Sequence, residues 1–77
     1  MQLKIKYFGM LAEVTNCHEE RISFSGGTVS DVLRILFKKH PKLEKKHYKV
    51  AQNHQIVSND VEVSTTEIVL LPPFSGG

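Results

Sequence analysis

Only one stretch of this 77-residue chain has the apolar spacing of an amphipathic helix. Its apolar residues recur at i, i+3, i+4, i+7 and i+8, which places them on one face of a helix. Thr28 and Asp31 stand where a hydroxyl and a carboxylate cap the first free amides of a helix, and Pro41 ends the pattern. The stripe consists of Val29, Val32, Leu33, Leu36 and Phe37. A lone helix of this kind pairs naturally with a small sheet.

The apolar residues outside this helix lie in segments typical of β-strands, because they alternate with polar residues or form short apolar runs between turn residues. A loop with room for one helical turn is expected over 10–16, and another over 41–47. The expected strands span 2–8, 20–24, 48–53, 54–57 and 68–71. The last of these does not alternate, which is typical of a central strand covered on both faces or of a strand at a partner interface.

The order of these elements predicts an α+β fold. Three strands follow the helix and two precede it, so one helix covers a mixed sheet of four to five strands, with the last strand beside the first. This arrangement is the ubiquitin-like β-grasp, and the pattern leaves another small α+β fold as the alternative. The predicted division of the chain is a β-grasp domain over 1–71 and an extended tail over 72–77.

Composition excludes several classes of function. Ten Lys and Arg against eight Asp and Glu give a net charge of +2, too small to recruit nucleic acid or an anionic membrane. The basic residues over 38–47 lack interleaved aromatics, as in a solvated helix end and loop. The single cysteine, Cys17, rules out an internal disulfide and fits a reducing compartment. With neither a signal peptide nor a membrane span predicted, the expected location is cytoplasmic.

The tail has a composition that a frayed chain end rarely shows. Two prolines cannot continue a sheet ladder, so they project the chain as a stiff arm. An apolar anchor and a small residue follow, and two residues without side chains can thread a narrow channel in a partner. The tail residues are Pro72, Pro73, Phe74, Ser75, Gly76 and Gly77. The group presented to a partner is then the carboxylate of Gly77, unless the tail is simply a flexible end.

A carboxylate reacts only after activation. An adenylate made from ATP by a partner converts Gly77 into an activated acyl group, from which a sulfur nucleophile leaves a thiocarboxylate and an amine leaves an amide. The chain itself has no phosphate-binding loop, since Gly26 and Gly27 lack the following Lys and Ser or Thr. No cofactor is therefore expected on this chain, and ATP and magnesium are expected on the activating partner.

The tail resembles that of the molybdopterin synthase small-subunit family, which ends in two apolar residues, Pro-Pro, a variable residue, a small residue and Gly-Gly. The corresponding stretch here is Leu70–Gly77. Ala51–Ser58 resembles the family's strand pair, and Lys6–Gly9 falls at its first strand. The similarity spans the chain in order. One departure is Ser64–Glu67, where the family often has an acidic turn, so the turn geometry before the last strand stays open.

The resemblance implies a sulfur carrier. Gly77 would be adenylated by a ubiquitin-activating-like adenylyltransferase, receive sulfur derived indirectly from a donor, and enter the large catalytic subunit of the synthase. There the sulfur would pass to cyclic pyranopterin monophosphate for molybdenum cofactor biosynthesis. By the same resemblance, Phe8, Ile56 and Leu71 form the partner interface, and the synthase is a heterotetramer of two small and two large subunits.

Other sites have weaker support in the sequence. Cys17 as a persulfide carrier would need an electropositive setting. The four histidines fall in separate predicted elements, so they are interpreted as scattered surface residues and no metal site is expected. They are His18, His40, His47 and His54. Ser75 has no base placed beside it, so the chain is expected to act as a substrate without catalytic side chains of its own.

Three alternative functions remain open from the sequence. The first is the sulfur carrier of thiamine-thiazole synthesis, which also ends in Gly-Gly but is expected to lack the Pro-Pro step. The second is a ubiquitin-like modifier joined to target lysines through Gly77. The third is an interaction module with an incidental tail.

Overall fold

The computed structural model describes residues 1–73. The predicted prolines Pro72 and Pro73 lie within this part, and the predicted site residues Phe74, Ser75, Gly76 and Gly77 lie outside it. The elements are β1 (Gln2–Tyr7), α1 (Met10–Thr15), β2 (Glu19–Ser23), α2 (Val29–Lys39), the 3₁₀ helix η1 (Pro41–Lys45), β3 (Lys49–Gln52), β4 (Gln55–Val57) and β5 (Glu67–Leu71). None of the helices over residues 1–73 is long and apolar enough to span a membrane.

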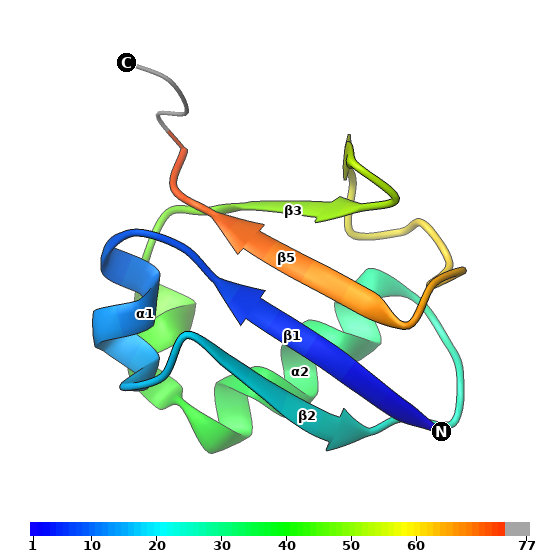
Figure 1. Ribbon diagram of the computed structural model, residues 1–77, viewed down its shortest axis with the longest axis horizontal. Helices are drawn as coiled ribbons and strands as arrows, with labels where there is room; N and C mark the ends of the chain where they lie inside the picture. Colours follow the sequence, from blue (N-terminus) through cyan, green and yellow to red (C-terminus); the bar gives the residue numbers. More distant parts are fainter. Residues whose placement is uncertain (74–77) are drawn as a thin grey trace.

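The strands form one mixed five-stranded sheet in the order β2-β1-β5-β3-β4. β5 lies at its centre, parallel to β1 and antiparallel to β3, as Figure 1 shows. β1 pairs with β2 as an antiparallel neighbour, and β3 pairs with β4 in the same way. The predicted position of the last strand beside the first is therefore confirmed, and the architecture is the predicted β-grasp.

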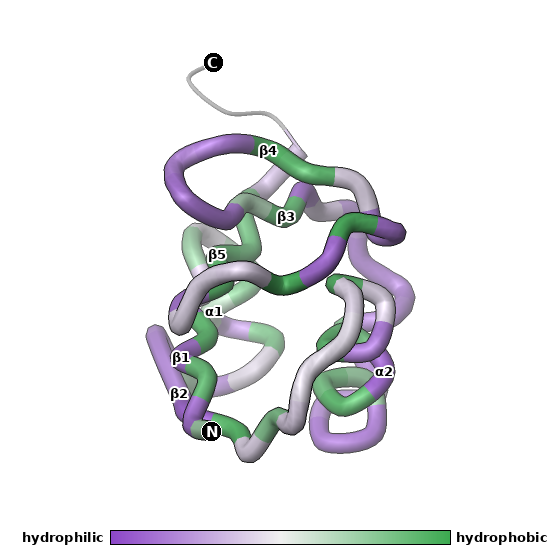
Figure 2. The backbone as a smooth tube through the Cα atoms, turned by 90° about the vertical axis from the view of Figure 1, so that its right-hand side faces the viewer, coloured by the Kyte–Doolittle hydropathy of each residue, from purple (hydrophilic) through white to green (hydrophobic). Residues whose placement is uncertain are grey.

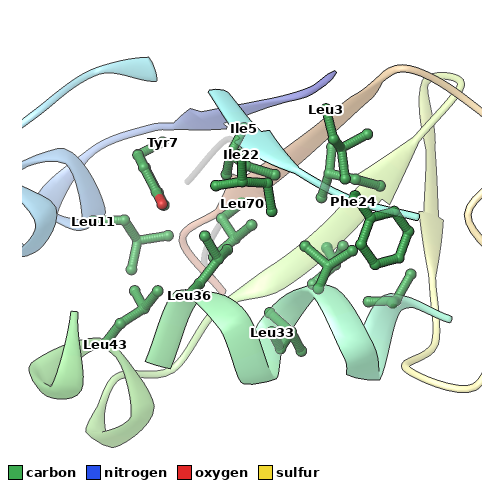
Figure 3. Close-up of a cluster of buried hydrophobic side chains, with 14 of the residues drawn as sticks. Leu3, Ile5, Tyr7, Leu11, Ile22, Phe24, Leu33, Leu36, Leu43 and Leu70 are labelled. Atoms are coloured by element: carbon green, nitrogen blue, oxygen red, sulfur yellow. The ribbon is translucent and has the colours of Figure 1, made fainter. Parts of the chain in front are cut away.

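α2 covers one face of this sheet (Figures 1 and 2). Its capping box is formed as expected, because the Thr28 side chain accepts from the Asp31 amide and the Asp31 carboxylate accepts from the Thr28 amide at 2.9 Å. The helix side chains point into a core shared with the strands (Figure 3). The buried apolar residues are Leu3, Ile5, Tyr7, Leu11, Ala12, Ile22, Phe24, Val29, Val32, Leu33, Leu36, Leu43, Val50, Ala51, Ile68 and Leu70.

Two local predictions differ from the structure. The stretch after Gly9, expected as a loop with room for one helical turn, forms the six-residue helix α1, which buries Leu11 and Ala12 and ends at Asn16 in the left-handed conformation. Asn53 and His54, both expected in strands, instead form a two-residue turn between β3 and β4. Asn53 and His54 have φ of 53° and 63°, and two positive φ values in succession match the twist of a tight hairpin.

The segment before β5 is fixed by a glutamine side chain. Gln52 is buried, donates to the Glu62 carbonyl at 2.9 Å, and accepts from the Ser64 amide at 3.1 Å. The Val63 amide also donates to the Gly27 carbonyl, which ties this segment to the start of α2. Both polar atoms of the buried Gln52 side chain are therefore hydrogen-bonded. They fix the backbone at Glu62 and Ser64, next to the stretch where the molybdopterin synthase small-subunit family often has an acidic turn.

Candidate functional site

The two faces of β5 differ in how they are covered. Ile68 and Leu70 are fully buried beneath α2, whereas Val69 and Leu71 point to the opposite face and are half-buried. A depression of about 460 Å³ lies on that opposite face. Its apolar lining is Phe8, Ala51, Ile56, Val69 and Leu71. The unalternating sequence of β5 is therefore explained by a core face and an open apolar face.

The three predicted interface residues lie together at this depression. Phe8 is 48% exposed, Ile56 is 57% exposed and Leu71 is half-buried, so the three form an exposed apolar patch. Polar residues also line it, including Lys6 and Glu67, which form an ion pair at 3.3 Å. An apolar centre with a charged rim is the usual anatomy of a protein-binding surface.

The tail leaves the domain beside Gly9. β5 ends at Leu71, and the Phe8 amide donates to the Leu70 carbonyl at 3.1 Å, so the chain after β1 lies against the end of β5. Gly9 has φ of +61°, and a Cβ placed on it would lie 2.8 Å from Cγ of Pro72. The absent side chain of Gly9 therefore leaves the space in which the ring of Pro72, the first residue after β5, sits.

We expect Gly9→Ala to move the root of the tail. The free energy of unfolding should fall by about 1–3 kcal/mol because alanine tolerates the backbone angles of Gly9 poorly, and any partner reaction at the end of the tail should slow by about tenfold or more because Pro72 is displaced. Gly26→Ala is the matched control, since Gly26 also has positive φ, at +116°, but a Cβ there meets nothing within 4 Å. Urea unfolding of both variants, and the rate of the partner reaction at the tail, check this. Equal rates in the two variants would contradict the positioning role.

A second group of polar side chains lies away from this face, around Glu20. Its Oε2 accepts from the Tyr7 hydroxyl at 2.6 Å and is 2.7 Å from Nε2 of His40, while its Oε1 is 2.5 Å from Nζ of Lys39. His40 is 15% exposed, so its interpretation as a surface histidine was wrong. Sequence spacing gave no signal for the group, because its members come from β1, β2 and the end of α2.

The Glu20 group has a marked electrostatic consequence. Partial burial opposes ionisation of Glu20, but hydrogen bonds from Lys39, Tyr7 and His40 outweigh it and lower the pKa of Glu20 to about 2. Burial and the adjacent Glu20 carboxylate raise the pKa of Tyr7 above its usual range, so its hydroxyl stays protonated and donates.

Because the pKa of Glu20 is lowered on folding, its contribution to stability should be present above the unfolded pKa of about 4.3 and lost as the pH falls toward 2. We expect Glu20→Gln to reduce the free energy of unfolding at pH 7 by about 1.5–3 kcal/mol, with a smaller deficit at pH 3. Urea unfolding between pH 3 and 7 measures this difference. Glu13→Gln, on the exposed side of α1, is the control. A deficit that stays constant with pH would contradict the assignment.

The chain matches the model of the ThiS family over residues 5–77. No curated protein matches it. Among solved structures it is similar to SAMP1 from Haloferax volcanii, at 29% identity over 100% of both chains with a TM-score of 0.83. It is also similar to small archaeal modifier protein 1 from Methanosarcina acetivorans, at 27% identity over 99% of this chain and 96% of that one, with a TM-score of 0.68.

A third similar structure is the putative molybdopterin converting factor, subunit 1, from Pyrococcus furiosus. It has a TM-score of 0.85 and 24% identity over 96% of this chain and 99% of that one, which shows a shared fold. These likenesses confirm the predicted resemblance to small ubiquitin-like sulfur carriers. Since the family model covers nearly the whole sequence, the chain belongs to the ThiS family.

Proposed function

We propose that the chain is the sulfur-carrier subunit of a molybdopterin synthase. The observation that carries the proposal is the continuity of β5, whose open face lies at the centre of an apolar depression and whose end runs directly into Pro72 and Pro73. A partner bound to this face would hold the root of the tail beside its own surface. The sequence Pro-Pro-Phe-Ser-Gly-Gly then supplies an unhindered carboxyl group for a partner's active site.

In the proposed cycle, an adenylyltransferase joins the AMP portion of ATP to the Gly77 carboxylate and releases pyrophosphate. A sulfur nucleophile then displaces AMP and leaves a thiocarboxylate. The large synthase subunit receives the tail, and the sulfur passes to cyclic pyranopterin monophosphate. In this cycle the chain docks on each partner through its apolar face and positions the tail. The reactions themselves take place in the active sites of the partners.

The open face suits two successive partners. Phe8, Ile56 and Leu71 offer apolar area that gains free energy when it is covered, at about 25 cal/mol per Å². The Lys6–Glu67 ion pair on the rim favours one orientation of a partner and adds little to its affinity. The same surface can therefore serve the activating enzyme and the large subunit in turn, as a carrier requires.

The test is a reconstitution followed by intact mass measurement. The chain is incubated with an adenylyltransferase, ATP, magnesium and a sulfur donor, and fragmentation locates any change. Sulfur in place of oxygen at Gly77, followed by formation of molybdopterin on addition of the large subunit, is the expected result. An unmodified chain, or a persulfide on Cys17, would contradict the proposal. Rescue of a thiamine auxotroph but not of a molybdenum-cofactor mutant would assign the carrier to thiazole synthesis.

A second candidate function is a ubiquitin-like protein modifier. It is favoured by the full-length likeness to small archaeal modifier protein 1 from two organisms. In that case an amine of a target lysine would attack the activated Gly77 and form an amide. Covalent ladders in cell extracts that resist reducing agent and require Gly77 would support this function. Their absence, together with a thiocarboxylate at Gly77, would support the carrier alone.

A further inference from the structure

Three side chains with different metal-binding atoms meet at one end of the sheet, away from the open apolar face. Cys17 lies between α1 and β2, Glu20 lies on β2, and His40 follows the last residue of α2. One ligand atom from each lies within 4.8 Å of the other two. Glu20 and His40 are 11% and 15% exposed, and Cys17 is half-buried. Their convergence comes from the fold, since the sequence separates His40 from the other two by α2.

Their spacing is close to that of a tetrahedral zinc site. Oε2 of Glu20 lies 2.7 Å from Nε2 of His40 and 3.9 Å from Sγ of Cys17. Bonds of about 2.0–2.3 Å to zinc place neighbouring ligand atoms roughly 3.2–3.7 Å apart. His40 would withdraw by about half an ångström and Cys17 would approach by a few tenths. Lys39 is bound to the other oxygen, Oε1, so it can keep its ion pair while Oε2 binds the metal.

We propose that Cys17, Glu20 and His40 form a binding site for a divalent zinc-type cation. A thiolate and a carboxylate neutralise the two positive charges, and the imidazole is the usual third ligand of zinc. On binding, the metal replaces the thiol proton of Cys17, which passes to solvent, and His40 binds through Nε2 with its proton on Nδ1. Three protein ligands leave the fourth position of the metal for a water molecule.

The site would act as a clamp on the fold. It joins the connection after α1, the strand β2 and the end of α2, of which the last two are already linked through the Glu20 carboxylate. A small domain gains much from such a link, because a metal that binds only the folded chain stabilises it by mass action. None of its three ligands lines the open apolar face or belongs to β5, so the clamp is independent of the sulfur-carrier proposal.

The test is cobalt binding to the full chain after metal is removed with a chelator. Titration with Co²⁺ should give one bound ion per chain, a thiolate-to-cobalt charge-transfer band in the near ultraviolet, and loss of that band when Zn²⁺ is added. The temperature of unfolding should rise when Zn²⁺ is present. Absence of the band at excess Co²⁺ would overturn the proposal.

Variants identify the ligands. Cys17→Ser should abolish the charge-transfer band, and His40→Gln should weaken Co²⁺ binding by at least about tenfold. His18→Gln is the matched control, because His18 is adjacent to Cys17 in sequence but exposed, and its affinity should equal that of the original chain. A band that survives Cys17→Ser, or an affinity lost in His18→Gln instead of His40→Gln, would contradict the site. If the His40→Gln variant does not fold, the charge-transfer band of the Cys17→Ser variant still decides the test.

Discussion

Removal of Gly76 and Gly77 is expected to abolish sulfur transfer while leaving the unfolding temperature of the domain unchanged. The reason is chemical: the proposed acceptor of AMP and then of sulfur is the Gly77 carboxyl group, and a chain shortened to Ser75 presents a hindered carboxyl group that lies two residues short. Glycine has no side chain to bury, so its loss removes no core contact. Intact mass after incubation with the activating enzyme and ATP measures the first effect, and circular dichroism on heating measures the second.

Adding one alanine after Gly77 is the complementary variant. It keeps every residue of the original chain and replaces the terminal carboxyl group by one on a residue with a Cβ, which a narrow channel excludes. Transfer should again fall below detection. Retained synthase activity in either variant would overturn the carrier proposal, whereas loss of activity together with loss of the cooperative unfolding transition would show a folding defect unrelated to the tail.

Ile56→Asp is expected to have the second largest effect, on partner binding. Ile56 is 57% exposed and lines the open face, so an aspartate there is solvated in the free chain but is stripped of water under a partner. Affinity for the activating enzyme and for the large subunit should fall by at least about tenfold to a hundredfold, as for other central interface residues. The unfolding free energy should change by less than about 0.5 kcal/mol, as for other exposed substitutions.

Ser30→Asp is the matched control for this charge. Ser30 is exposed on the first turn of α2, in the layer opposite the open face, so the same negative charge is added where no partner is proposed to bind. Calorimetric titration of each variant with each partner separates the two positions. If Ile56→Asp binds as well as Ser30→Asp does, the open face is not the docking surface.

Much of this fold follows from local sequence signals. The helical stripe and the Thr28–Asp31 box predict α2 within one residue at its start, because both depend on neighbours three or four positions apart. The four apolar residues ending at Leu71 predict a central strand, and β5 is central, with one face buried beneath α2 and the other open and apolar. Phe8 and Ile56 are predicted interface residues through resemblance, and the structure shows that both are exposed on the open apolar face.

The remaining features depend on contacts between residues distant in sequence. The sequence predicts only room for one helical turn where α1 lies, because six residues are too few for a periodic signal, and the helix is held by burial of Leu11. The turn at Asn53 and His54 was predicted as strand because such turns usually carry glycine at the second position, and histidine gives no such signal. The closeness of Gly9 to Pro72 brings together residues 63 positions apart, so no local pattern could predict it.

The central position of β5 also determines how the domain bears a load. A partner that pulls on the tail applies force along β5, and this strand pairs with β1 over 67–70 and with β3 over 69–71. Force along the strand therefore shears both ladders at once, whereas an edge strand would peel away one bond at a time. In the proposed carrier, withdrawal of the tail from a partner would therefore load two ladders together, so β5 would be harder to detach than an edge strand.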